Sequence, residues 1–252
     1  MKRLCVCCAF LLAAPLPGQN NTSFGTAASY FWGQKATSFV SGAANTQFWF
    51  VLEATAGRSY CVEAGNYEGG YGDGSPDMEL SVLGGNAVTV IRGNDDAGEE
   101  PKGFVNSRAC WVHTFPNPTV FVKLIPHAAS VPASAVTLRF VETTLYCPWY
   151  FVAGDYNAFS LIRNAASTAL SGVVVTWRGL DGTVAGTTTV SIPANGTVVL
   201  NARSFVNAGV FSNGSVEIAH SGSPEQIQGS TTTLSGTTGL GFDAVFGQRK
   251  AW

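Results

Sequence analysis

Carboxylate and amide side chains, gathered in two loops of the first half, are the residues best suited to chemistry. Hard cations such as calcium take about six to eight oxygen ligands, which carboxylates, amides and backbone carbonyls of glycine-rich loops supply. The five residues able to provide such a set are Asp73, Asp77, Asn94, Asp95 and Asp96. Calcium binding is one interpretation of these residues, and ordinary solvated loops are the other. The spacing excludes an EF-hand, because residues 73–77 lack the glycine and terminal glutamate of that loop in register.

Catalysis has little support in the sequence. A glycosidase needs two carboxylates facing a sugar bond, but turn formation explains the acidic loops equally well. The three histidines, His113, His127 and His220, lie in a strand, at a strand end and before a turn. The chain has no Gly-Xaa-Ser-Xaa-Gly elbow and no His-Glu-Xaa-Xaa-His motif. We therefore predict no catalytic residues and no enzymatic activity.

Aromatic residues in predicted loops or at the predicted junction are the second kind of candidate site. Exposed rings combine a large apolar face with, in tyrosine, a polar tip, which suits contacts with carbohydrate or protein. The candidate ligand-binding residues are Tyr67, Tyr71, Trp149, Tyr150 and Tyr156. The alternative for these rings is ordinary packing between domains. Trp49, Trp111 and Trp177 fall inside strand-like runs and are predicted core residues.

Predicted β-strands must position these candidate residues. The sequence indicates the strands as short apolar or alternating runs bounded by turn residues. The runs span residues 47–54, 60–64, 78–83, 87–91, 109–115, 119–125, 135–141, 156–163, 172–177, 187–192, 197–200, 214–220 and 227–234. We expect the first two to pair as a hairpin, and residues 142–150 to be a junction. Gly84-Gly85-Asn86 and Asp181-Gly182 are further hairpin signals. A spacing of about 8 to 12 residues, without a helical apolar period, predicts an all-β chain of two tandem antiparallel β-sandwich domains.

The N-terminus has the pattern of a cleaved secretory signal peptide. Lys2 and Arg3 precede an apolar run over residues 4–14, which ends in Pro15 and further helix-breaking residues. A buried N-terminal helix is the alternative. The predicted organisation is a signal peptide (1–18), a lead-in segment (19–44), a first sandwich (45–143) and a second sandwich (144–252). The later sequence predicts no membrane span, so we expect a protein secreted to the periplasm or the cell exterior.

Removal of the signal peptide leaves three cysteines, Cys61, Cys110 and Cys147. An oxidising compartment permits one disulfide among them, with three possible pairings. Cys61 and Cys110 both lie in strand-like runs whose alternation would point them inward, which favours a Cys61–Cys110 disulfide. Three buried free thiols are the alternative. No CxxC or Cys/His spacing indicates a metal site at these cysteines.

Composition excludes further classes of protein. Charged residues make up 12% of the 252 residues, the net charge is −2, and no Lys/Arg cluster offers a track for phosphates. Nucleic-acid binding is therefore not expected. The chain contains 16 Phe, 6 Trp and 7 Tyr. So many rings can be buried in a core that intrinsic disorder is not expected either.

The first half resembles the bacterial pre-peptidase C-terminal domain over residues 45–142. The matching segments are 48–52, Gly57 with 60–63, 77–82, the Asn-Asp-Asp-Ala-Gly loop 94–98, Ser107-Arg108 and 119–123. The sequence departs from that pattern at 116–119, where Pro-Asn-Pro-Thr replaces a Gly-Xaa-Tyr-Tyr step. This resemblance implies a secreted β-sandwich that accompanies enzymes without being catalytic.

The second half is similar to a C-terminal module of secreted bacterial proteins, in segments that include 155–159, 181–184, 192–196 and 239–243. This similarity implies fold and compartment. Together the observations predict an exported, non-catalytic module that binds polysaccharide or the cell-envelope surface. The alternative is a structural or protein-interaction component of the matrix or envelope. The sequence does not determine the oligomeric state.

Overall fold

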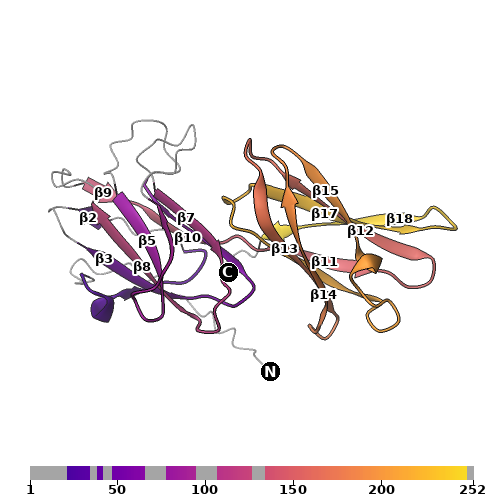
Figure 1. The fold of residues 1–252 in the computed structure, drawn as a ribbon, viewed down its shortest axis with the longest axis horizontal. Helices are drawn as coiled ribbons and strands as arrows, with labels where there is room; N and C mark the ends of the chain where they lie inside the picture. Colours follow the sequence, from indigo (N-terminus) through magenta and orange to yellow (C-terminus); the bar gives the residue numbers. More distant parts are fainter. Residues whose placement is uncertain are drawn as a thin grey trace, which may run out of the picture.

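The computed structural model describes residues 22–34, 39–41, 47–65, 78–94, 107–126 and 134–248. The all-β prediction is confirmed, because these residues form strands and two short 3-10 turns, η1 (Phe24–Thr26) and η2 (Ala202–Ser204). The strands gather into two bodies, which lie side by side in Figure 1. No helix in the described ranges is long and apolar enough to cross a membrane. The predicted signal peptide lies outside these ranges.

The first body, called here the N-terminal sandwich, contains ten strands within the described ranges. They are β1 (Ala28–Ser29), β2 (Phe39–Ser41), β3 (Phe48–Glu53), β4 (Ser59–Ala64), β5 (Met78–Gly84), β6 (Val90–Asn94), β7 (Ser107–Val112), β8 (Thr119–Pro126), β9 (Ser134–Val136) and β10 (Leu138–Glu142). A five-stranded sheet has the order β1-β3-β8-β5-β6, and a three-stranded sheet has the order β10-β4-β7. Strands β2 and β9 form a separate pair. Apart from the parallel contact of β1 with β3, neighbouring strands are antiparallel.

Alternating side chains from both sheets fill the core of the N-terminal sandwich. On β8, Val120, Val122 and Leu124 are buried while their neighbours are partly exposed, the period of two that a half-buried strand requires. Tyr60 contributes from β4, and Trp32 lies against it with ring centroids 4.3 Å apart. In the predicted lead-in segment, Ala28, Tyr30 and Trp32 therefore pack on this core.

Strands β3 and β4 do not form the predicted hairpin. β3 pairs with β1 and β8, whereas β4 pairs with β7 and β10 in the other sheet. Both strands bury apolar side chains in one core, and two sheets facing each other can do this from opposite sides. By contrast, the hairpin of β5 and β6 around Gly84-Gly85-Asn86 is confirmed.

The second body, called the C-terminal sandwich, is built from nine strands. They are β11 (Leu145–Phe151), β12 (Tyr156–Asn164), β13 (Leu170–Gly179), β14 (Val184–Ile192), β15 (Thr197–Asn201), β16 (Asn213–Ala219), β17 (Ile227–Ser235), β18 (Gly241–Val245) and β19 (Gly247–Gln248). One sheet has the order β14-β13-β16-β11-β19 and the other β15-β12-β17-β18. The segment expected to be a junction is largely strand β11, so the connection is just Thr143-Thr144.

The hairpin of β13 and β14 turns at Asp181-Gly182, as predicted. Gly182 has a φ of 81°, a conformation that glycine adopts without strain. Asp181 Oδ1 accepts a hydrogen bond from the Thr183 amide at 2.9 Å. The strands enclose a separate core around Trp177, which is fully buried, as expected from the sequence.

The Cys61–Cys110 disulfide is confirmed, but neither sulfur points into the sandwich core. Cys61 alternates with Tyr60 and Val62, which are both core residues, so its side chain projects from the opposite face of the sheet. Cys61 is nonetheless fully buried, because its Sγ lies 3.7 Å from the Gly222 carbonyl of the C-terminal sandwich. The third cysteine, Cys147, is a buried free thiol.

Candidate binding surface

Two of the predicted ligand-binding residues, Trp149 and Tyr156, belong to one group of rings on the C-terminal sandwich. Phe242 stacks on Trp149 with ring centroids 4.5 Å apart and an interplanar angle of 13°. Phe151 lies 6.1 Å from Trp149 and 5.4 Å from Tyr156, and Tyr156 lies 6.3 Å from Phe242. We call Trp149, Phe151, Tyr156 and Phe242 the aromatic cluster. Trp149 is 40% exposed and Phe242 is 36% exposed, so solvent reaches the stacked pair.

An irregularity in β11 explains how Trp149 comes to face solvent. The pairing of β11 with β16 shifts register between Cys147 and Tyr150. A bulge of this kind bends a strand and redirects its side chains. Trp149 is consequently exposed, whereas Tyr150 is fully buried in the core of the C-terminal sandwich. The expectation that Tyr150 presents an exposed ring is therefore wrong.

Sequence reasoning missed two members of the aromatic cluster. Phe242 lies in β18, a strand that was not predicted because its glycine-rich surroundings resemble a loop. Phe151 directly follows a run that was assigned to the junction. The signal that could have found them is the pair of aromatic residues two apart, Trp149 and Phe151, which an extended strand places on one side. The other predicted ligand-binding residues, Tyr67 and Tyr71, lie outside the described residues.

Hydrogen bonds fix the backbone that leads into Tyr156. Asp155 Oδ2 accepts hydrogen bonds from Ser235 Oγ at 2.6 Å and from the Thr237 amide at 3.1 Å. These hydrogen bonds lower the pKa of Asp155. Arg203 Nη2 donates to the Tyr156 carbonyl at 2.8 Å. The start of β12 is thus held from two sides, which limits the freedom of the aromatic cluster.

The proposed calcium ligands gain no support from the described residues. Asn94 ends β6, and its Oδ1 accepts a hydrogen bond from the Arg108 amide at 3.1 Å. The other four candidates, Asp73, Asp77, Asp95 and Asp96, lie outside the described residues. Within the described ranges, no group of three or more His, Cys, Asp and Glu side chains could hold a metal ion.

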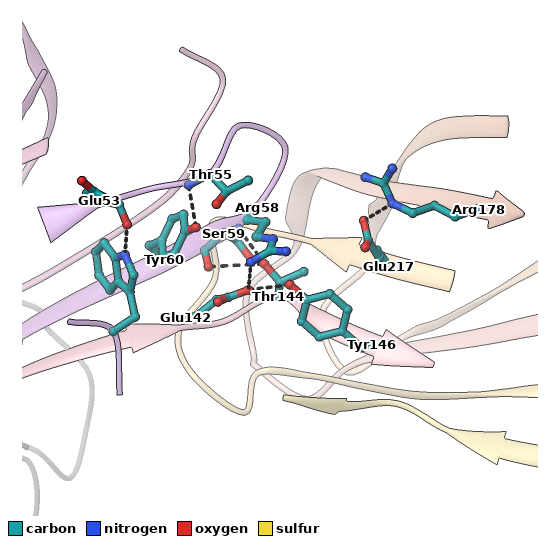
Figure 2. A network of polar contacts seen from close by, with 11 residues as sticks. Glu53, Thr55, Arg58, Ser59, Tyr60, Glu142, Thr144, Tyr146, Arg178 and Glu217 are labelled. Atoms are coloured by element: carbon teal, nitrogen blue, oxygen red, sulfur yellow. Dashed lines mark hydrogen bonds and ion pairs between the residues drawn. The ribbon is translucent and has the colours of Figure 1, made fainter. Parts of the chain in front are cut away.

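A polar network joins the two sandwiches beside the start of β11 (Figure 2). Arg58 Nη1 lies 3.7 Å from Glu142 Oε1, and the Tyr146 hydroxyl donates to the same carboxylate oxygen at 2.5 Å. The Arg58 guanidinium also lies 5.9 Å from the centre of the Tyr146 ring. Burial, together with the hydrogen bond to Glu142, raises the pKa of Tyr146 well above its usual range. This phenol therefore stays protonated and remains a donor.

Backbone hydrogen bonds reinforce the same junction. The Thr143 amide donates to the Ser59 carbonyl at 2.8 Å, and the Ser59 amide donates to Thr144 Oγ1 at 2.8 Å. Ser59 is fully buried, so these bonds are shielded from water. Because buried backbone groups are costly to leave unpaired, we infer that the connection holds the two sandwiches in a defined orientation.

Two hollows flank the short strand β19 at the junction. The smaller one, called here the junction hollow, has a volume of about 560 Å³. Its lining residues are Arg58, Tyr146, Pro148, Val245, Gly247 and Gln248. The larger one, of about 1210 Å³, includes Arg139, Glu142, Arg163 and Glu225 in its lining. Both aromatic residues that line the larger hollow, Phe140 and Phe246, are buried.

His220 is buried at the junction and gives the fold a dependence on pH. Its ring is 1% exposed, and burial lowers its pKa to about 4, although a hydrogen bond with the Thr143 backbone opposes the shift. Below a pH of about 6.5 the unfolded chain binds a proton at this imidazole, whereas the folded chain does so only near pH 4. Stability is therefore lost as the pH falls through this window.

We expect His220 to account for about 3 kcal/mol of lost unfolding free energy between pH 7 and pH 4. Urea unfolding curves of the natural protein and of a His220→Asn variant would measure this loss. Between pH 7 and pH 4, the unfolding free energy of the variant should fall by about 3 kcal/mol less than that of the natural protein. Parallel pH profiles for the two proteins would contradict the assignment.

Comparisons with known proteins give no family. No protein-family model and no curated protein matches the chain. The chain is similar to the full extracellular region of zebrafish Gpr126/Adgrg6, with 10% identity, coverage of 90% of this chain and 34% of that chain, and a TM-score of 0.24. It is also similar to a calcium-binding mutant of Bacteroides uniformis β-glucuronidase 2, with 11% identity, coverage of 79% and 26%, and a TM-score of 0.21. The chain thus spans about a third or less of these two proteins, and similarity at this level supports no argument about function.

Proposed function

We propose that the protein is an exported, non-catalytic module that binds polysaccharide or the glycan surface of a cell envelope. The observation that carries this proposal is the aromatic cluster, whose stacked pair Trp149 and Phe242 is partly exposed. Sugar rings have apolar C–H faces, which pack against aromatic rings while their hydroxyls stay in water. Aromatic side chains also lose little conformational entropy on binding, since they have few rotatable bonds.

The acids and bases placed by the structure support a binding role over a catalytic one. Near the aromatic cluster, Asp155 accepts hydrogen bonds from Ser235 and Thr237, and Asp243 accepts one from Thr232. His113 and His220 are each 1% exposed, so neither imidazole reaches a substrate in solution. The remaining histidine, His127, lies outside the described residues.

An export route is part of the same proposal. A structural disulfide such as Cys61–Cys110 persists in oxidising compartments and is rare in the cytosol of most cells. The apolar N-terminal run, preceded by Lys2 and Arg3, supplies the expected export signal. Secretion to the cell exterior or periplasm agrees with a polysaccharide as the ligand.

The alternative function, a structural or protein-interaction role, is favoured by exposed apolar side chains on the hairpin of β17 and β18. Leu240 is 64% exposed and Val245 is 72% exposed. Strand β18 is also the edge of its sheet, and edge strands offer unpaired backbone groups to a partner. This surface would bind protein without requiring the stacked rings of Trp149 and Phe242.

Depletion of the mature chain from solution by insoluble polysaccharides tests the proposed function. The panel contains cellulose, chitin, xylan and peptidoglycan. We expect at least one polymer to bind the protein, and Trp149→Ala or Phe242→Ala to weaken that binding about 10-fold, since an aromatic contact contributes about 0.5–1.5 kcal/mol beyond its buried area.

The matched control is Phe31→Ala, because Phe31 is 72% exposed but lies in the N-terminal sandwich. Its binding should equal that of the natural protein. Unfolding curves of all three variants check that each remains folded. Equal binding by all three would remove the aromatic cluster as the site. Absence of binding to every polymer would favour the protein-interaction alternative.

A further inference from the structure

We propose that the junction hollow is a second subsite for the same ligand and that it binds the carboxylate of an acidic polysaccharide through Arg58. This inference rests on the proposed function and narrows its ligand to a polyanionic glycan. Three features of the described structure lead to it: the position of the hollow beside the aromatic cluster, the charge of its lining, and the rigidity with which Arg58 is held.

The junction hollow and the aromatic cluster lie along the same two strands. On β11, Tyr146 and Pro148 line the hollow, and the next residue, Trp149, belongs to the cluster. On β18, Val245 lines the hollow and Phe242 belongs to the cluster. Since a strand rises about 3.3 Å per residue, the two sites are separated by roughly 10 Å along β18. Val245 and Phe242 are three residues apart, so their side chains leave opposite faces of β18. Because β18 is the edge strand of its sheet, one glycan chain that passes over this edge can contact both sites.

The lining of the junction hollow carries a positively charged side chain, that of Arg58. Arg58 is the charged residue among its described lining residues, and its side chain is 28% exposed. The partner carboxylate of Glu142 is 8% exposed, lines the larger hollow instead, and accepts the Tyr146 hydroxyl. A guanidinium has five N–H donors in a planar fork that matches a carboxylate. Among the described residues, Glu142 is the carboxylate that pairs with Arg58, at 3.7 Å, and this pair leaves guanidinium donors for a ligand.

Local hydrogen bonds hold Arg58 in place before any ligand binds. Gly57, with a φ of 84°, makes the turn that precedes it, and the Gly57 amide donates to the His113 carbonyl at 2.7 Å. The His113 amide donates in return to the Arg58 carbonyl at 2.8 Å. The Tyr146 ring lies beside the guanidinium. Because the arginine is ordered in advance, binding a carboxylate costs less conformational entropy.

The test compares two polymers with the same backbone, polygalacturonate and its fully methyl-esterified form, by equilibrium binding to the mature chain. We expect polygalacturonate to bind at least about 10-fold more tightly at low salt, because a hydrogen bond between two charged groups is stronger than one between neutral groups. Most of this preference should vanish near 1 M salt, where the Debye length is about 3 Å. Arg58→Gln should abolish the preference and leave binding of the ester unchanged.

Two further variants make the result specific. Arg178→Gln is the matched control, because Arg178 is 32% exposed and pairs with Glu217 at 2.7 Å in the C-terminal sandwich (Figure 2) but does not line the hollow. It should keep the preference for the acid. Arg58→Lys should retain part of it, since the charge remains. Unfolding curves show whether each variant is folded.

The outcomes separate this inference from the proposed function. Equal binding of the acid and the ester, lost in Trp149→Ala, would overturn the Arg58 subsite and keep the aromatic cluster. A preference for the acid that survives Arg58→Gln would overturn it as well. Other glycans of the panel could bind through Trp149 while neither galacturonate polymer binds. That result would also overturn the Arg58 subsite and keep the aromatic cluster. Failure of every glycan to bind would overturn both proposals.

Discussion

Replacing Trp177 with alanine is expected to lower the unfolding free energy of the C-terminal sandwich by about 3–5 kcal/mol. The indole is fully buried and stacks on Phe205 with ring centroids 4.9 Å apart and an interplanar angle of 9°. Alanine would leave a large cavity between the two sheets, and close-packed interiors relax only partly around such a void. Chemical denaturation followed by circular dichroism measures the loss.

Trp149→Ala provides the matched control for this stability prediction. Trp149 is in the same sandwich but is 40% exposed, so its removal should cost about 1 kcal/mol or less. The loss of unfolding free energy for Trp177→Phe should fall between those for Trp177→Ala and Trp149→Ala, because phenylalanine keeps a ring in the cavity. It also removes the Trp177 indole N–H, which has no hydrogen-bond partner among the described residues. Equal losses for Trp177→Ala and Trp149→Ala would show that the core around Trp177 is not the one described.

Removing the disulfide by the double substitution Cys61→Ala and Cys110→Ala should cost the N-terminal sandwich about 4 kcal/mol. The two cysteines are 49 residues apart in sequence. Cross-linking a loop of this length lowers the entropy of the unfolded chain, which accounts for the estimate. Calorimetry of the natural protein and the double variant measures the difference as a lower transition temperature.

A reductant supplies the control for the disulfide prediction. Dithiothreitol should destabilise the natural protein toward the level of the double variant, and it should leave the double variant unchanged, because the remaining Cys147 is a free thiol. Further destabilisation of the double variant by the reductant would contradict the assignment of one disulfide. An unchanged transition temperature in the double variant would contradict its stabilising role.

The local pattern of the sequence predicted most strands of the fold. On β8, the alternation of Val120, Val122 and Leu124 with polar or half-exposed residues is visible in the sequence and matches their burial. The Asp181-Gly182 turn was equally predictable, since a positive φ at Gly182 depends on residue type within the turn itself. The disulfide pairing was favoured because Cys61 and Cys110 both lie in strand-like runs of the first half, whose alternation was expected to point them inward.

Pairing between strands depended on information that is not local. The turn after β3 looked like a hairpin, yet β3 and β4 lie in different sheets. The same strand can join either sheet of a sandwich, and the choice rests on how all apolar faces are buried together. For this reason the sequence also placed Cys61 on the wrong face of β4, although its partner was right.

The residues of the candidate site also fall into two groups, those that the sequence identified and those that only the tertiary structure brings together. By itself the sequence determined most strand segments and the turns at Gly84-Gly85-Asn86 and Asp181-Gly182, and it gave Trp149 and Tyr156 as candidates, because these depend on residue type and short-range spacing. It favoured the Cys61–Cys110 pairing among three. Tertiary structure alone decided that Tyr150 is buried, that Phe242 stacks on Trp149, and that Arg58 meets Tyr146 at the junction. These contacts join strands far apart in the chain, so they exist only once both sheets of each sandwich have packed.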